Sequence, residues 1–175
     1  VKTRFRKNKS HNVVSQHKKV NHKWEIKLNS KPHPQYKGES DNELIDKQNG
    51  GTDFRTGKWQ GFYAQDMSVE INLNKKTKIN SISTNFTQDI RSWIWYPENV
   101  SYYCSNNGTD WTLIEIVKNE IPIDDYNNSI QKLTTNQQFK ARYIKVVAKN
   151  RGVCPEWHLG KGNTTFIFAD EIEID

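Results

Sequence analysis

The sequence predicts an all-β fold, either a sandwich or a barrel, on three observations. Helical periodicity is hard to find along the 175 residues, whereas short runs that alternate apolar and polar residues recur along most of the chain. Clusters of Asn, Gly, Asp and Pro, which are typical of turns, bound these runs. Aromatic residues make up 11% of the chain, including six Trp, which indicates a packed core. The length suits one domain, since domains average roughly 150 residues.

Seven candidate strands follow one another along the chain. In the clearest of them, alternation places Ile144, Val146 and Ala148 on one face and a mixed set on the other. This pattern is expected of a sheet that packs against a core on one side. Turn signals built on Asn and Gly separate the strands. The candidate strands cover residues 24–28, 68–73, 78–86, 100–104, 112–117, 142–148 and 165–174.

Three of the connections are long and rich in aromatic rings. They cover residues 52–63, 88–97 and 150–164. Long loops on a rigid sheet scaffold are usually functional, because the scaffold fixes where they lie while their side chains vary. We therefore expect ligand contacts in these loops.

The formal net charge of +6 is distributed unevenly. The first 23 residues hold eight of the 26 basic residues and no acidic residue, so the rest of the chain has 18 basic against 20 acidic residues. A nucleic-acid-binding domain carries its positive charge on the folded face. We therefore expect no nucleic-acid partner. Residues 1–22 are interpreted as a basic linker or the remnant of a preceding β-domain, and residues 23–175 as the module itself.

The chain has no stretch of 18 apolar residues, so the sequence predicts no membrane span. It begins without Met or a signal peptide, which suggests a fragment excised from a longer protein. Cys104 and Cys154 form no disulfide framework and lack metal-ligand spacing. Alternation places Cys104 on one face with Val100 and Tyr102, as expected of a buried thiol. Cys154 is either free or paired.

Four stretches resemble the coagulation-factor type C, or discoidin, superfamily. In order and spacing they are most similar to the family 32 carbohydrate-binding modules at the C-terminus of bacterial family 20 β-N-acetylhexosaminidases. The resemblance covers about residues 24–175. The stretches are Gly-Gly-Thr-Asp-Phe-Arg-Thr-Gly-Lys-Trp-Gln-Gly-Phe at 50–62, Arg-Ser-Trp-Ile-Trp-Tyr-Pro at 91–97, Ser-Asn-Asn-Gly-Thr-Asp-Trp at 105–111 and Phe-Ile-Phe-Ala-Asp-Glu-Ile at 166–172.

The resemblance implies a jelly-roll β-sandwich of the galactose-binding-domain-like type, which binds glycan on the loops at one end. It implies a non-catalytic carbohydrate-binding module that targets an attached glycoside hydrolase to galactose- or N-acetylhexosamine-containing glycans. The partners would then be a glycan and a covalently attached upstream catalytic domain. The protein would be bacterial and secreted, periplasmic or on the cell surface.

Arg91, Trp93 and Trp95 form the first group of candidate ligand-binding residues. Residues two apart in an extended loop point the same way, so these side chains should form one surface. A pyranose has an apolar face of C–H groups and a rim of hydroxyls, so its binder needs an exposed ring and fixed hydrogen-bonding groups. The alternative is that one of the two tryptophans plugs the end of the sandwich.

Trp157 heads the second group of ligand candidates, in the loop at 150–164. His158 is its neighbour, and Arg151, Lys161 and Asn163 supply further polar groups. His158 either contacts the ligand or fixes the loop by a hydrogen bond. Of the remaining tryptophans, Trp24 and Trp111 are expected to be structural, and Trp59 could take either role.

The resemblance also implies one structural calcium ion, because the family's metal loop gathers several oxygens. In this sequence Lys47 follows Asp46, where the family commonly has glycine. The alternative is that Asp46 fixes a turn and Glu171 is solvated. The positions that match the metal loop are Asp46, Asn49, Thr52, Asp53, the carbonyl of Ala169, and Glu171.

The chain is not expected to be an enzyme. Its adjacent carboxylate pairs, at 124–125 and 170–171, would point to opposite faces of an extended strand and could not flank one glycosidic bond. The barrel that carries catalysis in the hexosaminidase relatives needs a longer chain. The alternative functions keep the fold: a module that binds sulfated or anionic polysaccharide, a protein or surface adhesion module, or a structural spacer.

Overall fold

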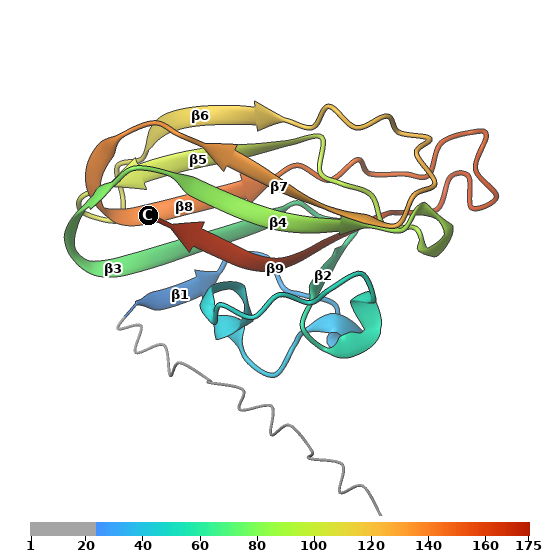
Figure 1. Ribbon diagram of the computed structural model, residues 1–175, viewed down its shortest axis with the longest axis horizontal. Coiled ribbons are helices and arrows are strands. Elements are labelled where there is room, and N and C mark those ends of the chain that lie inside the picture. The colour runs from blue at the N-terminus through green and yellow to red at the C-terminus, as the bar shows by residue number, and fades with distance from the viewer. Residues whose placement is uncertain (1–23) are drawn as a thin grey trace, which may run out of the picture.

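The computed structural model describes residues 24–175, in which nine strands form two sheets that pack face to face (Figure 1). The predicted boundary between residues 22 and 23 lies outside this range. No helix within the described range is long and apolar enough to cross a membrane. The strands are β1 (Glu25–Leu28), β2 (Gln60–Tyr63), β3 (Met67–Ile79), β4 (Ile82–Gln88), β5 (Asn99–Ser105), β6 (Thr112–Lys118), β7 (Ser129–Thr135), β8 (Phe139–Ala148) and β9 (Phe166–Ile174), and short 3-10 turns form η1 (Pro34–Tyr36), η2 (Asp41–Ile45), η3 (Phe54–Thr56) and η4 (Ile90–Ser92).

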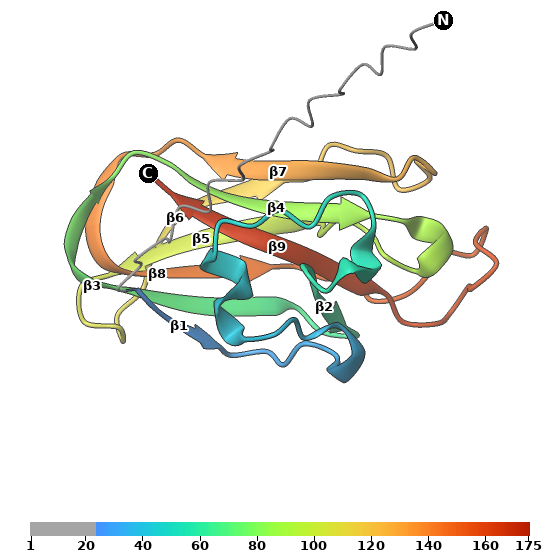
Figure 2. The same cartoon turned by 60° about the horizontal axis from the view of Figure 1, so that its bottom comes forward.

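The two sheets differ in size. The larger has the strand order β1-β3-β8-β5-β6 and the smaller the order β2-β9-β4-β7. Every neighbouring pair is antiparallel. Figure 2 shows β9 running through the middle of the smaller sheet, between β4 and β2. The predicted all-β sandwich is confirmed.

The core lies between the sheets and follows the period of two in each strand. In β3, Met67, Val69 and Ile71 are fully buried, and in β8 the same is true of Ile144 and Val146. Each such side chain contributes about 1.5–3 kcal/mol when it leaves water. The alternation read from the sequence therefore identifies the face of each strand that packs.

Tyr102 links the two sheets. Its ring is fully buried, and its hydroxyl donates to the carbonyl of Leu133 at 2.7 Å. Tyr102 lies on β5 of the larger sheet and Leu133 on β7 of the smaller one. Because a buried hydroxyl needs a partner, this hydrogen bond fixes how the sheets sit on one another.

Most of the predicted strands coincide with observed ones. The segments at 24–28, 68–73, 100–104, 112–117, 142–148 and 165–174 match β1, β3, β5, β6, β8 and β9, whereas 78–86 spans the turn between β3 and β4. The sequence does not predict β2 or β7. The first has four residues, one of them Gly61, and the second is mostly polar along its length.

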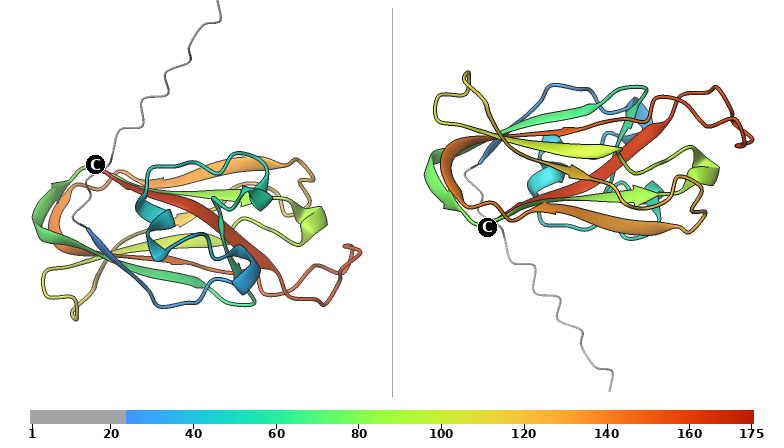
Figure 3. Two further views of the ribbon diagram at one scale, coloured as in Figure 1. Left: turned by 90° about the horizontal axis from the view of Figure 1, so that it is seen from below. Right: turned by 90° about the horizontal axis from the view of Figure 1, so that it is seen from above.

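Three connections meet at one end of the sandwich. The β4–β5, β6–β7 and β8–β9 loops all lie at the right in Figure 1 and in both views of Figure 3. The turns between β3 and β4, β5 and β6, and β7 and β8 lie at the opposite end. Two of the three loops predicted to be functional, at 88–97 and 150–164, are therefore neighbours in space.

Candidate functional site

Hydrogen bonds join the three loops at this end. The amide of Phe166 donates to the carbonyl of Trp93 at 2.9 Å, which joins the β4–β5 loop to the end of the β8–β9 loop. The buried Gln88 donates through its side-chain amide to the carbonyl of Asp125 at 3.0 Å, which joins the β6–β7 loop to β4. The loops therefore present one surface, built on the rigid ends of the strands.

Trp95 faces the core. Only 2% of its surface is exposed, and it packs with Ile90 and Cys154. Its indole N–H donates to the carbonyl of Ile123 at 2.9 Å. A ring with both faces covered cannot stack on a sugar, so the prediction that Trp95 binds ligand is wrong. It plugs the end of the sandwich, which was the alternative, and the Cys154 thiol beside it is free.

Trp93 takes a different direction because its backbone lies in the left-handed region, with φ at 62°. The prediction that Trp93 and Trp95 point the same way assumed an extended loop, and this residue breaks the alternation. Its ring is half-buried against Gly160, where an added Cβ would come within 2.5 Å of the indole nitrogen. The Trp93 ring therefore packs against the β8–β9 loop, and only part of it is exposed to solvent.

His158 holds its own loop together. It is 5% exposed, its Nδ1 accepts from the Gly160 amide at 3.0 Å, and its ring meets that of Trp95 edge to face at 5.1 Å. These contacts support the loop-fixing alternative for His158. Asn163 acts similarly, since its side-chain amide donates to the Gly160 carbonyl at 3.0 Å.

Two other predicted ligand residues lie at the margins of the loop. Lys161 is exposed and lies 3.6 Å from Glu156. Arg151 is half-buried, and within the described chain its buried Nε has no hydrogen-bond partner. Burial lowers the pKa of the Arg151 guanidinium, and Glu98 acts in the opposite sense. Neither residue contributes to the ring surface described next.

Arg91, Tyr126 and Trp157 form an exposed group, which we call the loop-end cluster. The rings of Tyr126 and Trp157 are 43% and 47% exposed, with centroids 6.0 Å apart and planes inclined by 57°. The Arg91 guanidinium lies 5.1 Å from the centroid of the Tyr126 ring and donates to the Tyr126 carbonyl at 2.9 Å. One loop contributes each member, so the cluster depends on the join between the loops.

Tyr126 was not identified as a ligand candidate from the sequence. It lies in a polar stretch before β7, a strand that the sequence does not predict, so nothing placed it near Trp157. The available signal was an isolated aromatic residue between two Asp and two Asn residues. A large ring in so polar a loop is unusual unless it packs or binds.

The other three tryptophans are structural. Trp59 is 1% exposed and donates from its indole nitrogen to the Gly51 carbonyl at 3.1 Å. Trp111 is half-buried, with the Lys145 ammonium 4.1 Å from a ring centroid. Trp24 is half-buried and packs against the main core. The expectations for Trp24 and Trp111 agree with this placement, and the open question over Trp59 is resolved in favour of the core.

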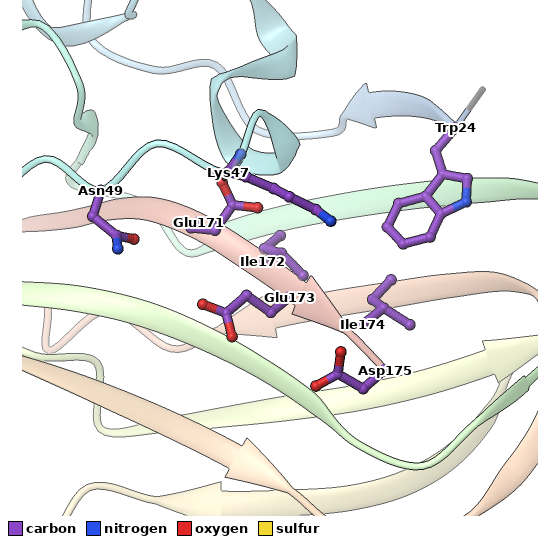
Figure 4. A pocket seen from close by; sticks show the side chains of 8 residues that line it. All are labelled: Trp24, Lys47, Asn49, Glu171, Ile172, Glu173, Ile174 and Asp175. Carbon is purple, nitrogen blue, oxygen red and sulfur yellow. Dashed lines mark hydrogen bonds between the residues drawn. The ribbon is translucent and has the colours of Figure 1, made fainter. Parts of the chain in front are cut away.

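The predicted metal loop lies beside β9 and lines a pocket of about 230 Å³ (Figure 4). Lys47, Asn49 and Glu171 contribute side chains to this pocket, with Trp24 and Asp175 at its far end. The loop is tied to β9 by its backbone: the Lys47 amide donates to Glu171 Oε2 at 2.7 Å. The Gly50 amide likewise donates to the Asp170 carboxylate at 2.7 Å.

The carboxylates proposed for calcium are engaged in separate hydrogen bonds. Asp46 accepts from the backbone and side-chain amides of Gln48, and Asp53 accepts from the backbone and guanidinium of Arg55. Within residues 24–175, no group of three or more His, Cys, Asp or Glu side chains is placed to hold a metal ion. Of the remaining candidates, Asn49 accepts from Asn85, Thr52 is exposed and Ala169 is buried in β9.

These side chains do not make the converging oxygen set that a hard cation needs. Asp46 fixes a turn, which was the alternative reading of that residue. Glu171 is buried rather than solvated, at the point where the loop meets β9. Burial raises the pKa of Glu171 to about 8, with Asp46, Asp170 and Glu173 adding to the effect and the Lys47 amide opposing it. Calcium binding remains a prediction from the resemblance.

Comparison with known proteins identifies the family of the chain. The sequence matches the F5/8 type C domain over residues 11–164. No curated protein matches it by sequence. A family 32 carbohydrate-binding module from Clostridium perfringens, in complex with GalNAc-β-1,3-galactose, has a TM-score of 0.56 and 16% identity, covering 86% of this chain and 94% of that one.

Two further solved structures have the same architecture. The family 32 module of Clostridium perfringens NanJ, in complex with galactose, has a TM-score of 0.51 and 18% identity, over 86% of this chain and 92% of that one. A fucolectin from striped bass (Morone saxatilis) serum has a TM-score of 0.55 and 16% identity, over 86% of this chain and 46% of that one. At these identities the likeness concerns the fold, a galactose-binding-like jelly roll. With that fold, and with the family match covering most of its length, the chain belongs to the F5/8 type C, or discoidin, domain family.

Proposed function

We propose that this chain is a non-catalytic carbohydrate-binding module that holds a sugar on the loop-end cluster. The observation that carries the proposal is the pair of exposed rings, Tyr126 and Trp157, beside the Arg91 guanidinium. These side chains lie on loops joined by hydrogen bonds, so little order has to be gained on binding.

The chemistry of a pyranose suits this surface. The apolar C–H face of the sugar would lie on Trp157 or Tyr126, and burying an aromatic face is favourable. Arg91 donates from one terminal nitrogen to the Tyr126 carbonyl. Its other N–H groups would donate to hydroxyl groups of the sugar. A shallow surface offers few contacts, so we expect dissociation constants of roughly millimolar to micromolar for single sugars.

The solved relatives support a glycan ligand and suggest which one. Two of the similar modules were solved with galactose or GalNAc-β-1,3-galactose. Another, also from Clostridium perfringens, is a module of a family 31 glycoside hydrolase. We therefore propose that this chain binds galactose- or N-acetylhexosamine-containing glycans and, in a secreted or cell-surface protein, directs an attached glycoside hydrolase to them.

The carboxylates of the described chain support a binding role over a catalytic one. Asp170 and Glu171 are buried on β9, and each accepts a hydrogen bond from the backbone of the 46–50 loop. Asp125 fixes its own turn by accepting from the backbone and side chain of Asn127. Glycoside hydrolysis needs one carboxyl group on each side of the glycosidic bond. These carboxylates instead hold a loop and a turn in place.

The test is titration of the full chain with galactose and with GalNAc-β-1,3-galactose by calorimetry. We expect Trp157→Ala to weaken binding by about tenfold or more, since stacking rings dominate such sites. Trp111→Ala is the matched control, because Trp111 lies in a different part of the fold beside Lys145. Thermal unfolding of both variants checks that each remains folded.

Two results would contradict the proposal. One is an absence of binding to any sugar on a broad glycan array. The other is binding that Trp157→Ala leaves unchanged.

A further inference from the structure

A second hollow lies away from the loop-end cluster. It has a volume of about 420 Å³ and is lined by residues 34–39, which include η1, and residues 54–59, which include η3. These are the blue and teal turns below β2 in Figure 1, on the side of the molecule opposite β6. Its size lies within the range of small-molecule sites, about 300–1,000 Å³.

The walls of the hollow are rich in positive charge. Lys37, Arg55 and Lys58 line it, against Glu39 as the acidic residue among the lining positions. Lys37 and Arg55 are exposed, and Lys58 is half-buried. None of the ion pairs within residues 24–175 involves Lys37 or Lys58. Two ammonium groups therefore face the hollow region without an anionic partner in the described chain.

Arg55 is held in place beside these lysines. Its Nε donates to the Asp53 carboxylate at 2.9 Å, and its guanidinium lies 5.3 Å from the centroid of the Phe54 ring. The same hydrogen bond to Arg55 lowers the pKa of Asp53, so the carboxylate stays charged at neutral pH. Because Asp53 takes only Nε, the terminal nitrogens of Arg55 can donate in a bidentate manner to another anion.

The base of the hollow is aromatic and rigid. The Tyr36 ring meets those of Phe168 and Phe54 at centroid distances of 4.9 and 5.8 Å. The buried Gln60 donates through its side-chain amide to the carbonyls of Lys37 and Ser40, at 2.9 and 3.1 Å, which fixes the turn after η1. A half-buried ring and the held Arg55 guanidinium thus line one space together with two lysines.

We propose that this hollow binds an acidic sugar unit, through a carboxylate or a sulfate ester on its rim. Guanidinium and ammonium groups recognise both anions by charge-assisted hydrogen bonds, and the half-buried Tyr36 ring offers apolar surface for the sugar's C–H face. The site is separate from the loop-end cluster and does not depend on it. It makes the module selective for glycans that carry charge as well as neutral sugar.

The experiment uses the full chain with Trp157→Ala, so that the loop-end cluster is disabled in every sample. Digalacturonic acid provides the carboxylate probe, galactose 6-sulfate the sulfate probe, and galactose the neutral control. Amide chemical shifts of residues 34–39 and 54–59 report where each probe binds. We expect both regions to shift with an acidic probe and to stay unchanged with galactose, and we expect added salt to weaken the binding.

Lys37→Ala with Lys58→Ala removes two of the three cations. We expect this double variant to weaken binding of the acidic probe by about tenfold, which corresponds to about 1.4 kcal/mol. Lys75→Ala with Lys76→Ala is the matched control, because these exposed lysines lie on β3 and line no part of the hollow. An equal loss in both double variants, or no shift at 34–39 and 54–59 with either acidic probe, would overturn the proposal.

Discussion

At the residue scale, one backbone angle decides how Trp93 and Trp95 are directed. Trp93 closes η4 with φ at 62°, a conformation that is uncommon for a bulky side chain. The backbone therefore turns at Trp93, so that Trp95 is directed into the core while Arg91 stays outside. The cost of holding a tryptophan in this region, on the order of 1–2 kcal/mol, is offset by the burial of Trp95.

Lys47 is a second residue in the left-handed region, with φ at 64°. In this conformation the Lys47 amide donates a hydrogen bond to the Glu171 carboxylate. A lysine is strained in the left-handed region, whereas a glycine is not. We expect Lys47→Gly to raise the free energy of unfolding by about 0.5–1 kcal/mol, measured by urea denaturation. Lys76→Gly, in β3, should lower it instead. A loss of stability in Lys47→Gly would show that the side chain does more than tolerate the turn.

At the scale of elements, β9 and the 46–50 loop meet through buried carboxyl groups. Burial raises the pKa of Glu171 to about 8 and that of Asp170 to about 6. Glu171 therefore holds its proton in the folded chain at pH values where the unfolded chain, near 4.5, has lost it. Its contribution to stability is present below pH 4.5 and is lost as the pH rises towards 8.

We expect Glu171→Gln to change this dependence, because the amide stays neutral at every pH. Urea denaturation in the presence of a chelator should show that wild type loses more stability than Glu171→Gln between pH 5 and pH 8. The same series with calcium tests the prediction from the family resemblance. If calcium stabilises wild type at pH 8 and not Glu171→Gln, the loop holds a cation after all.

The elements also show how far the sequence can be read. Strands such as β3 and β8 are predictable because one face is continuously apolar, with Met67, Val69 and Ile71 in the core. The strand β7 is not predictable, because polar residues lie on both of its faces. Pairing with β4 sets its place in the sheet. The sequence likewise predicts only part of the loop-end cluster. Arg91 and Trp157 belong to loops that the sequence identifies, whereas Tyr126 comes near them only through tertiary structure.

At the scale of the whole molecule, the contact between the sheets should determine cooperativity. Tyr102→Phe removes the hydroxyl that donates to the Leu133 carbonyl and leaves that buried acceptor without its partner. We expect a loss of about 1–2 kcal/mol in the free energy of unfolding, with a single transition retained. Tyr103→Phe, a half-buried neighbour on the same strand, is the control and should change stability by less than about 0.5 kcal/mol. Equal effects in the two variants would contradict this role for Tyr102.

The two ends of the described chain are close together. Trp24 and Asp175 line one pocket, beside β1 and the end of β9, and the loop-end cluster lies at the far end of the sandwich (Figures 1 and 4). A polypeptide that continues after Asp175 would therefore start at the end of the sandwich opposite the loop-end cluster. In a larger protein, the loops proposed to bind sugar would then face away from a domain attached at that end.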